Sequence, residues 1–174
     1  YEMLRSLVGS EMCIRDSAKM CQQAIHDGNK ILLCGNGGSA ADSQHIAAEF
    51  VGRFVKERVS LPAIALTTDT SILTAVGNDY GYDEVFRRQV EGLGRKGDVL
   101  IGISTSGNSK NVLAAFVQAK KMGIHTVAFT GGKASKSEKV ADIILKVPST
   151  VTARIQECHI LVGHIICQYV DEEY

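Results

Sequence analysis

The sequence has no excess charge of either sign, and this excludes partners that are recognised by bulk charge. Lysine and arginine together number 19, as do aspartate and glutamate, so the formal net charge is zero. Without a net positive field we expect neither nucleic acid nor an anionic membrane surface as a partner. No apolar run is long enough to cross a bilayer, so we expect no membrane-spanning segment.

Proline and paired cysteines are also scarce. Two prolines accompany 17 glycines, a balance that suits an α/β protein with many strand-to-helix turns. The five cysteines show neither CxxC spacing nor a disulfide framework. Cys34 falls in a predicted strand, and Cys158 and Cys167 fall in a predicted helix, where a buried thiol is the usual state. We therefore expect a reducing, cytoplasmic setting.

The first part of the chain, residues 1–17, differs in character from the rest. The segment Leu7–Ser17, LVGSEMCIRDS, is the in-frame translation of the end of a common transposase sequencing adapter. We interpret it as adapter-derived and extend this interpretation to Tyr1–Ser6, so that a foreign leader stands where a native N-terminal segment is expected. Such segments are excluded from fold reasoning. The prediction is a single domain over residues 18–174.

Strand and helix patterns alternate along residues 18–174. Short apolar runs predict strands at Lys30–Cys34, Pro62–Thr68, Val99–Ile103, Thr126–Thr130 and Asp142–Val147. Helical patterns occur at Ala18–His26, Ala40–Phe54, Ser71–Val76, Asp83–Leu93, Asn111–Met122, Ser135–Val140 and Ala153–Val170, and a polar turn is predicted at Gly77–Gly81. Because no hairpin signal separates the strands, the pattern predicts a parallel, three-layer α/β/α sandwich.

Two loops rich in glycine and serine each join a predicted strand to a helix. Gly35–Ser39, GNGGS, follows the first strand, and Ser104–Ser109, STSGNS, follows Val99–Ile103. Free backbone N–H groups, hydroxyls and a helix dipole favour an anion there, although N-capping alone also explains one such turn. In parallel sheets ligands bind beyond the carboxyl ends of strands. Since GNGGS matches neither the dinucleotide fingerprint nor the P-loop, the two loops predict a small phosphorylated ligand.

Histidines and carboxylates on two predicted helices are candidates for metal binding or acid–base catalysis. His45 and Glu49 lie four residues apart on one helix face, which suits a divalent metal, proton transfer or a plain surface pair. The terminal helix carries Gln156, His159 and His164. Gln156 and His164 are about 12 Å apart along the axis at ~1.5 Å per residue. Spacing alone does not choose between His159 and His164, nor does it exclude a structural histidine.

Four segments spread over the chain carry a family resemblance: CGNGGSAADSQHIAAEFVGRF, LTTDTSILTAVGNDYG, GDVLIGISTSGNSKNVL and RIQECHILVGHIICQ. Together they resemble the sedoheptulose 7-phosphate isomerase (phosphoheptose isomerase) family of sugar isomerase, or SIS, domains. The resemblance implies a flavodoxin-like fold with a five-stranded parallel sheet, usually in a homotetramer. It also implies an aldose–ketose isomerase that converts D-sedoheptulose 7-phosphate to D-glycero-D-manno-heptose 7-phosphate through an enediol. This reaction supplies heptose for lipopolysaccharide or other bacterial glycoconjugates.

The same resemblance implies roles for individual residues. One Zn²⁺ per subunit would be held by His45, Glu49, Gln156 and His164, which favours His164 over His159. Glu49 and His164 would transfer the protons. Substrate contacts are implied for Asn36, Gly37, Gly38, Glu49, Asn78, Asp79 and Gln156, and phosphate contacts for Ser104, Thr105, Ser106 and Ser109.

Two other functions stay open on the sequence. SIS domains also serve as non-catalytic regulators that bind phosphosugars, and one relative of the family binds a replication initiator. Such a regulator would not need the four predicted metal ligands. The second alternative is an isomerase of another phosphosugar, because the loops recognise phosphate rather than carbon number. In family members a long N-terminal helix packs between subunits, so we expect the foreign leader to weaken the tetramer.

Overall fold

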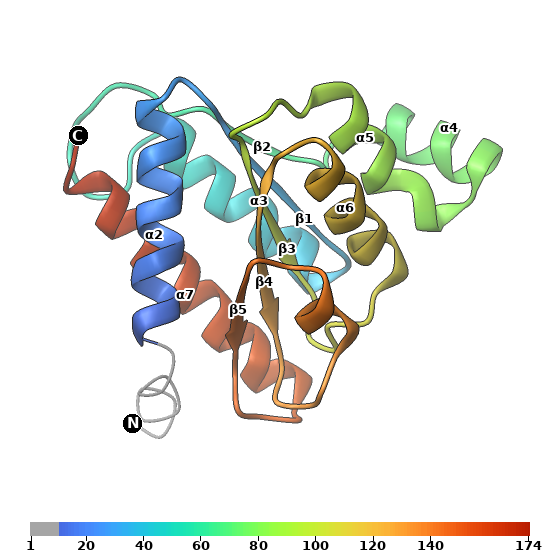
Figure 1. Ribbon diagram of the computed structural model, residues 1–174. Coiled ribbons are helices and arrows are strands. Elements are labelled where there is room, and N and C mark those ends of the chain that lie inside the picture. Colours follow the sequence, from blue (N-terminus) through green and yellow to red (C-terminus); the bar gives the residue numbers. More distant parts are fainter. Residues whose placement is uncertain (1–10) are drawn as a thin grey trace.

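The computed structural model describes residues 11–174, and residues 1–10 of the predicted leader lie outside the described part. Five strands form one parallel sheet in the order β2-β1-β3-β4-β5 (Figure 1). They are Ile31–Gly35 (β1), Ala63–Ala65 (β2), Val99–Ile103 (β3), His125–Thr130 (β4) and Ile143–Lys146 (β5). The five-stranded parallel sheet is therefore confirmed. β1 and β3 are buried along their whole length, because parallel sheets are covered on both faces.

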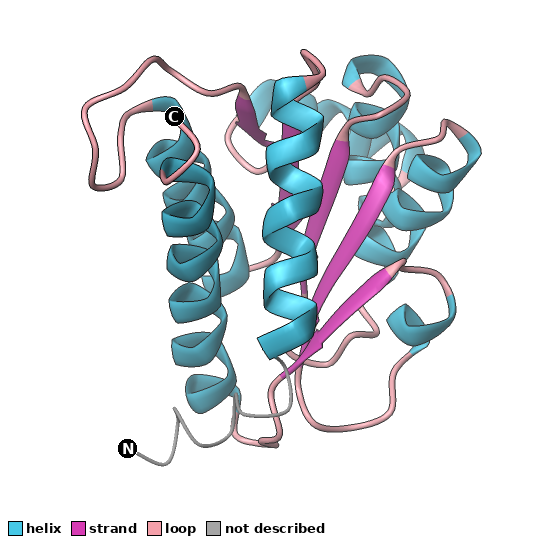
Figure 2. Ribbon diagram, turned by 60° about the vertical axis from the view of Figure 1, so that its left-hand side comes forward, coloured by secondary structure: helices cyan, strands magenta, loops and turns pink. Residues whose placement is uncertain are grey.

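Helices cover both faces of the sheet and make three layers (Figure 2). One face carries α2 (Glu11–His26), α3 (Gly38–Val51) and α7 (Thr152–Asp171), which share an apolar core with the strands. The other face carries α4 (Thr70–Tyr80), α5 (Val85–Leu93) and α6 (Lys110–Lys121), with a second core. Two short 3-10 turns span Tyr82–Glu84 (η1) and Lys136–Lys139 (η2). The α/β/α sandwich is thus confirmed.

Two helices extend several residues beyond the prediction. α2 begins at Glu11 rather than at Ala18, because the buried side chain of Ile14 extends its packed face toward the N-terminus. α4 continues to Tyr80, so the polar turn predicted at Gly77–Gly81 is wrong. The chain leaves the helix only at the last residue of that range, a glycine with φ of 90°.

The two predicted loops lie where the order of the strands reverses. β1 pairs with β2 on one side and with β3 on the other. The connection after β1 enters α3 on one face of the sheet, and the connection after β3 enters α6 on the opposite face. The two loops therefore diverge toward opposite faces of the sheet, and in open parallel sheets ligands usually bind between loops that diverge in this way.

α3 and α7 lie side by side on one face of the sheet (Figure 1). Gly163 of α7 is buried against α3, and a Cβ built on it would lie 2.7 Å from Cγ1 of Ile46. Ile46 is itself fully buried, with 0 % of its surface exposed. The missing side chain at Gly163 thus allows the two helix backbones to approach each other closely.

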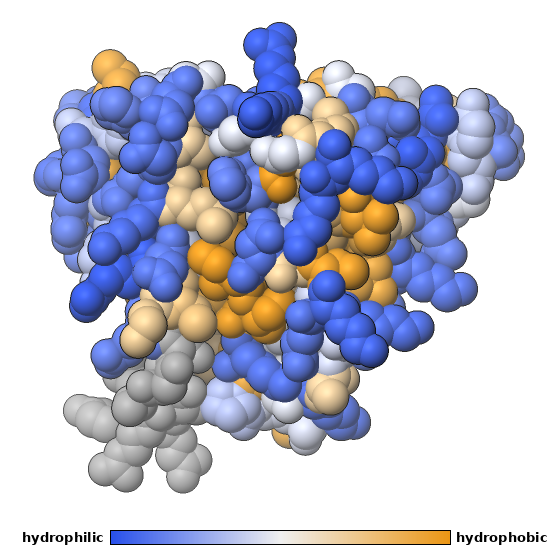
Figure 3. Space-filling view, in the orientation of Figure 1, coloured by the Kyte–Doolittle hydropathy of each residue, from blue (hydrophilic) through white to orange (hydrophobic). Residues whose placement is uncertain are grey.

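Parts of the surface leave apolar side chains only half covered. Figure 3 shows a mostly hydrophilic face with hydrophobic side chains gathered around the edge strand β5, where Ile143 and Ile144 are half-buried. α4 has no buried residue, although it carries Ile72, Leu73 and Val76. Within residues 11–174, no helix has the length and apolar character needed to cross a membrane.

Replacing Gly163 with alanine is expected to destabilise the fold. The added methyl group collides with Ile46 at a cost of ~1–3 kcal/mol, which exceeds the ~0.5–1 kcal/mol that alanine gains in a helix interior. The control is Gly92→Ala in α5, where nothing lies within 4 Å of the added carbon. In urea denaturation, Gly163→Ala should lower the midpoint and Gly92→Ala should not. Equal midpoints for the two variants would contradict this account of the helix contact.

Candidate active site

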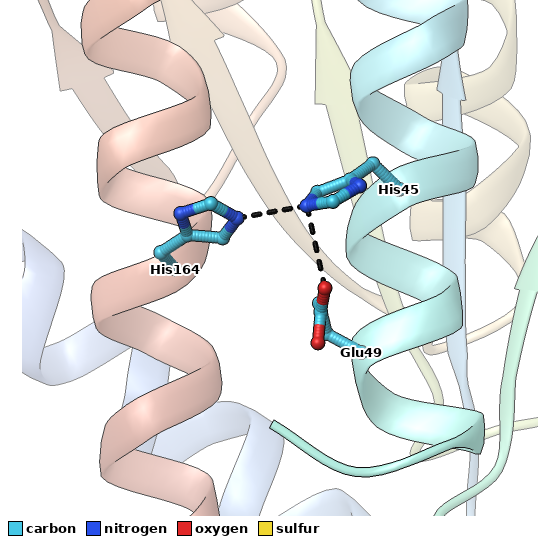
Figure 4. Close-up of side chains that lie close together, drawn as sticks. All are labelled: His45, Glu49 and His164. Carbon is cyan, nitrogen blue, oxygen red and sulfur yellow. Dashed lines mark hydrogen bonds and ion pairs between the residues drawn. The ribbon is translucent and has the colours of Figure 1, made fainter. Parts of the chain in front are cut away.

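Three side chains from α3 and α7 converge beside the helix contact (Figure 4). His45 and Glu49 come from successive turns of α3, and His164 follows Gly163 on α7. The two imidazole Nε2 atoms lie 2.9 Å apart, and Oε1 of Glu49 lies 3.3 Å from Nε2 of His45. The ring of Phe54 lies against His164 with centroids 5.5 Å apart. The result is a cluster of nitrogen and oxygen donors with one apolar wall.

The cluster fits the coordination of a divalent metal such as zinc. The candidate ligand atoms of His45, Glu49 and His164 all lie within 4.8 Å of one another. Tetrahedral Zn²⁺ with bonds of about 2.0–2.1 Å holds neighbouring ligand atoms about 3.3 Å apart. The separations of 2.9 and 3.3 Å therefore need only small side-chain adjustments. Because half of the His45 side chain, 50 %, is exposed, a solute can reach the cluster.

Gln156 lies at one end of the α3–α7 interface. A Cβ built on Gly38, at the start of α3, would lie 2.9 Å from Cδ of Gln156, so only glycine leaves room for this amide. His164 follows Gln156 by about 12 Å along the axis of α7. The structure thus places the fourth predicted metal ligand against the first loop, about two turns from His164.

The first loop is tied to α6 by a pair of amides. Asn36 Nδ2 donates to Oδ1 of Asn111, and Asn111 Nδ2 donates to Oδ1 of Asn36, both over 2.9 Å. The hydroxyl of Tyr82 also donates to Oδ1 of Asn36 over 3.1 Å. Neither partner of Asn36 was predicted from the sequence. Asn111 stands two residues after the second loop and could have been considered there, whereas nothing in the sequence around Tyr82 indicates this contact.

The second loop gathers hydroxyl groups before α6. Oγ of Ser104 lies 2.9 Å from Oγ of Ser109 and 3.4 Å from Oγ of Ser106. Backbone N–H groups of Gly107 and Asn108 donate to Ser104 and Ser106. The loop also lines a pocket of 230 Å³ together with the segments that follow β4 and β5 and the start of α7; its lining includes Thr105, Ser106, Lys133, Thr150 and Ile155. The hydroxyl groups and the nearby lysine make this region suitable for an anion.

Asn78 and Asp79 lie on the last turn of α4, on the opposite face of the sheet from α3 and α7. Both side chains are exposed, and Nδ2 of Asn78 donates to Oδ1 of Asp79 over 2.8 Å. In the described chain no hydrogen bond joins either of them to the loops or to the cluster. The nearby link to the first loop is made by Tyr82 instead.

His159 faces the sheet and stands apart from the cluster. Its exposed fraction is 1 %, and Nε2 donates to the carbonyl oxygen of Thr130 at the end of β4 over 3.1 Å. The next residue, Gly131, donates its N–H to the carbonyl oxygen of Thr105 in the second loop. Burial lowers the pKa of His159 to about 4, so the ring is neutral near pH 7. The structure brings His164, and not His159, to His45.

The sequence and the fold are similar to those of known proteins. The SIS domain family matches residues 3–131. A phosphoheptose isomerase of Sulfurimonas denitrificans is 59% identical over 160 residues, which are 92% of this chain and 82% of that protein. A solved phosphoheptose isomerase from Neisseria gonorrhoeae has a TM-score of 0.90 at 48% identity, covering 98% of this chain and 94% of that one. Another, from Francisella tularensis, has a TM-score of 0.92 at 37% identity, covering 98% and 93%.

The buried ring of His159 is expected to make folding stability depend on pH. Because its pKa is about 4 when folded and 6.5 ordinarily, the unfolded chain binds a proton at higher pH than the folded chain does. The neutral His159 ring therefore contributes fully to the free energy of unfolding above about pH 6.5, and this contribution is lost as the pH falls toward 4. Between pH 7 and pH 5 the free energy of unfolding should fall by on the order of 1–2 kcal/mol for this reason.

Urea denaturation at pH 7 and at pH 5 checks this expectation. In His159→Gln the difference in unfolding free energy between the two pH values should shrink by that amount. The control variant His26→Gln, at an exposed position of α2, keeps the buried ring and should retain the full dependence. The account of His159 fails if its variant keeps the pH dependence of the parent.

Proposed function

The chain belongs to the phosphoheptose isomerase family of SIS domains and is a phosphosugar isomerase, and we propose that it interconverts D-sedoheptulose 7-phosphate and D-glycero-D-manno-heptose 7-phosphate. The observation that carries this proposal is the convergence of His45, Glu49 and His164 on α3 and on α7, the helix that begins at the pocket of the hydroxyl-rich loop. A regulator that only binds a phosphosugar has no use for such a cluster. The cluster therefore favours catalysis over sensing.

The reaction moves hydrogen without net oxidation. A base takes a proton from C1 of the open-chain ketose while the C2 oxygen gains one, which gives the enediol. A proton then adds to C2 as the O1 hydroxyl loses its own, which gives the aldose. We assign these transfers to Glu49 and His164, because a carboxylate and an imidazole can both accept and return protons near neutral pH.

One metal ion per subunit would assist these transfers. His45, Glu49 and His164, together with Gln156 as the family resemblance implies, would hold Zn²⁺, which supplies Lewis acidity at the carbonyl and hydroxyl oxygens. The carboxylate of Glu49 has two oxygen atoms and several lone pairs. One oxygen faces His45 Nε2, so the carboxylate can contribute to the donor set and still take a proton from the substrate.

The length of α7 suits a seven-carbon substrate. Ile155 lines the pocket at the second loop, and His164 lies about 13 Å farther along the helix axis. An extended seven-carbon sugar phosphate spans on the order of 10 Å from phosphorus to C1, given C–C bonds of about 1.5 Å. With its phosphate at Ser104, Thr105, Ser106 and Ser109, such a substrate would extend along α7 and direct its carbonyl end toward the cluster.

We further propose that the enzyme is a homotetramer in the cytoplasm. A neighbouring subunit would cover the half-buried apolar residues of α4 and would give the exposed Asn78 and Asp79 a substrate to contact. The foreign leader is expected to weaken this assembly. All five cysteines are free thiols, which supports a reducing compartment.

Replacing Glu49 with glutamine is expected to lower turnover of sedoheptulose 7-phosphate by about 10²–10⁴-fold, since an amide cannot accept the C1 proton. Incorporation of deuterium at C1 in D₂O, followed by NMR, measures the proton transfer itself. The matched control is Glu57→Gln, at an exposed carboxylate paired with Arg53 on the surface. It should turn over like the parent.

Phosphate binding, followed by ³¹P NMR, separates loss of chemistry from loss of the fold. Glu49→Gln should still bind the substrate phosphate through the second loop. Turnover in this variant within tenfold of the parent would remove Glu49 from the proposed mechanism.

A further inference from the structure

A buried ion pair joins the end of α3 to the end of α7. Arg58, in the segment after α3, has 1 % of its side chain exposed, and Asp171, the last residue of α7, has 2 %. Nε of Arg58 donates to Oδ1 of Asp171 over 2.6 Å. Two charged groups are therefore removed from water at the interface that carries the donor cluster.

The rest of the Arg58 guanidinium holds the last turn of α3. Nη2 donates to the carbonyl oxygen of Glu49 over 2.9 Å, and Nη1 donates to that of Phe50 over 3.0 Å. These carbonyls belong to the group that a helix end leaves without intrahelical donors. Arg58 thus fixes the backbone of the residue whose carboxylate belongs to the cluster.

Asp171 is held on both oxygens. Its Oδ2 accepts the backbone N–H groups of Val55 and Lys56 over 3.0 and 2.7 Å. Burial alone would raise the pKa of Asp171, but the Lys56 N–H and the Arg58 guanidinium outweigh it and keep the pKa below its ordinary value. Asp171 follows His164 by about two turns of α7, so its position bears directly on the placement of that imidazole.

We propose that Arg58 and Asp171 are positioning residues, which set the spacing of α3 and α7 so that Glu49 and His45 meet His164 in metal-binding geometry. This inference rests on the metal site proposed above. Arg58 acts on the α3 side through the Glu49 carbonyl, and Asp171 acts on the α7 side through its helix. Neither side chain touches the substrate or the metal.

Stability alone is a weak reason for burying this pair. Desolvation offsets much of the attraction between two buried charges, and apolar side chains of similar volume often stabilise a fold as well. The planar guanidinium, however, directs its donors at fixed angles toward the carboxylate and two helix carbonyls. Such a fork specifies the relative position of the two helix ends, which an apolar contact would leave free to slide.

Titration of the metal-free full chain with Co²⁺, whose visible absorption reports its coordination, tests the proposal. Asp171→Asn should weaken Co²⁺ binding by about 10–100-fold, as loss of an outer-shell partner typically does, and should change the visible spectrum. The control is Asp98→Asn, which breaks the largely buried pair of Asp98 with Lys30, 2.6 Å apart, just before β3 and β1. It should lower stability and leave Co²⁺ affinity unchanged.

Arg58→Lys provides a second variant that keeps the charge. The lysine can still pair with Asp171, but it cannot also reach the Glu49 and Phe50 carbonyls as the fork does. It should therefore weaken Co²⁺ binding as well. If the parent binds Co²⁺ and the Arg58 and Asp171 variants bind it equally well, the positioning role is overturned.

A parent chain that binds no Co²⁺ would instead refute the metal site, and the imidazole NMR signals of the metal-free chain then decide the positioning role. Asp171→Asn or Arg58→Lys should shift the signals of His45 and His164, while Asp98→Asn should not. Unmoved signals in both variants would overturn the proposal independently of the metal.

Discussion

Gly163 of α7 touches Ile46 of α3, and the neighbours of this contact, His164 and His45, carry imidazoles 2.9 Å apart. The site therefore depends on how closely two helices approach each other. Ile46 is packed in the core between the helices and the sheet, so α3 cannot move away from α7 without opening a cavity in that core. Close packing transmits such a constraint because interiors hold few voids into which a side chain could move.

The sheet and the helices contribute different parts of the site: the strands end at the two loops, and the helices carry the donor cluster. The carboxyl ends of β1 and β3 present the two loops, and the amides of Asn36 and Asn111 link the first loop to α6, the helix that follows the second loop. The residues to which we assign the chemistry lie on α3 and α7, on one face of the sheet. α7 begins at the pocket of the second loop and continues past the cluster, so one rigid helix connects the proposed phosphate site to the proposed metal site.

Much of the fold could be predicted from sequence because its signals are local. The buried strand Val99–Ile103 has the predicted bounds, and the alternation of strands and helices required a parallel sheet. The turn predicted at Gly77–Gly81 failed because glycine, asparagine and aspartate are tolerated in the last turn of an exposed helix.

The site could be predicted only in part. Spacing placed His45 and Glu49 on one face but could not choose between His159 and His164, since both lie on the same long helix. That choice came from the family resemblance, and the helix contact at Gly163 gives it a physical reason. Tyr82 and Arg58 make their contacts across the fold, so no local pattern indicates them.

An NMR time course of the full chain with sedoheptulose 7-phosphate, run once with zinc and once with a chelator, tests the central claim most directly. The account predicts that signals of D-glycero-D-manno-heptose 7-phosphate grow with zinc and stay absent with the chelator. Conversion that continues in the chelator would contradict the metal site. Substrate signals that broaden without any conversion would contradict catalysis and leave a phosphosugar-binding protein in its place.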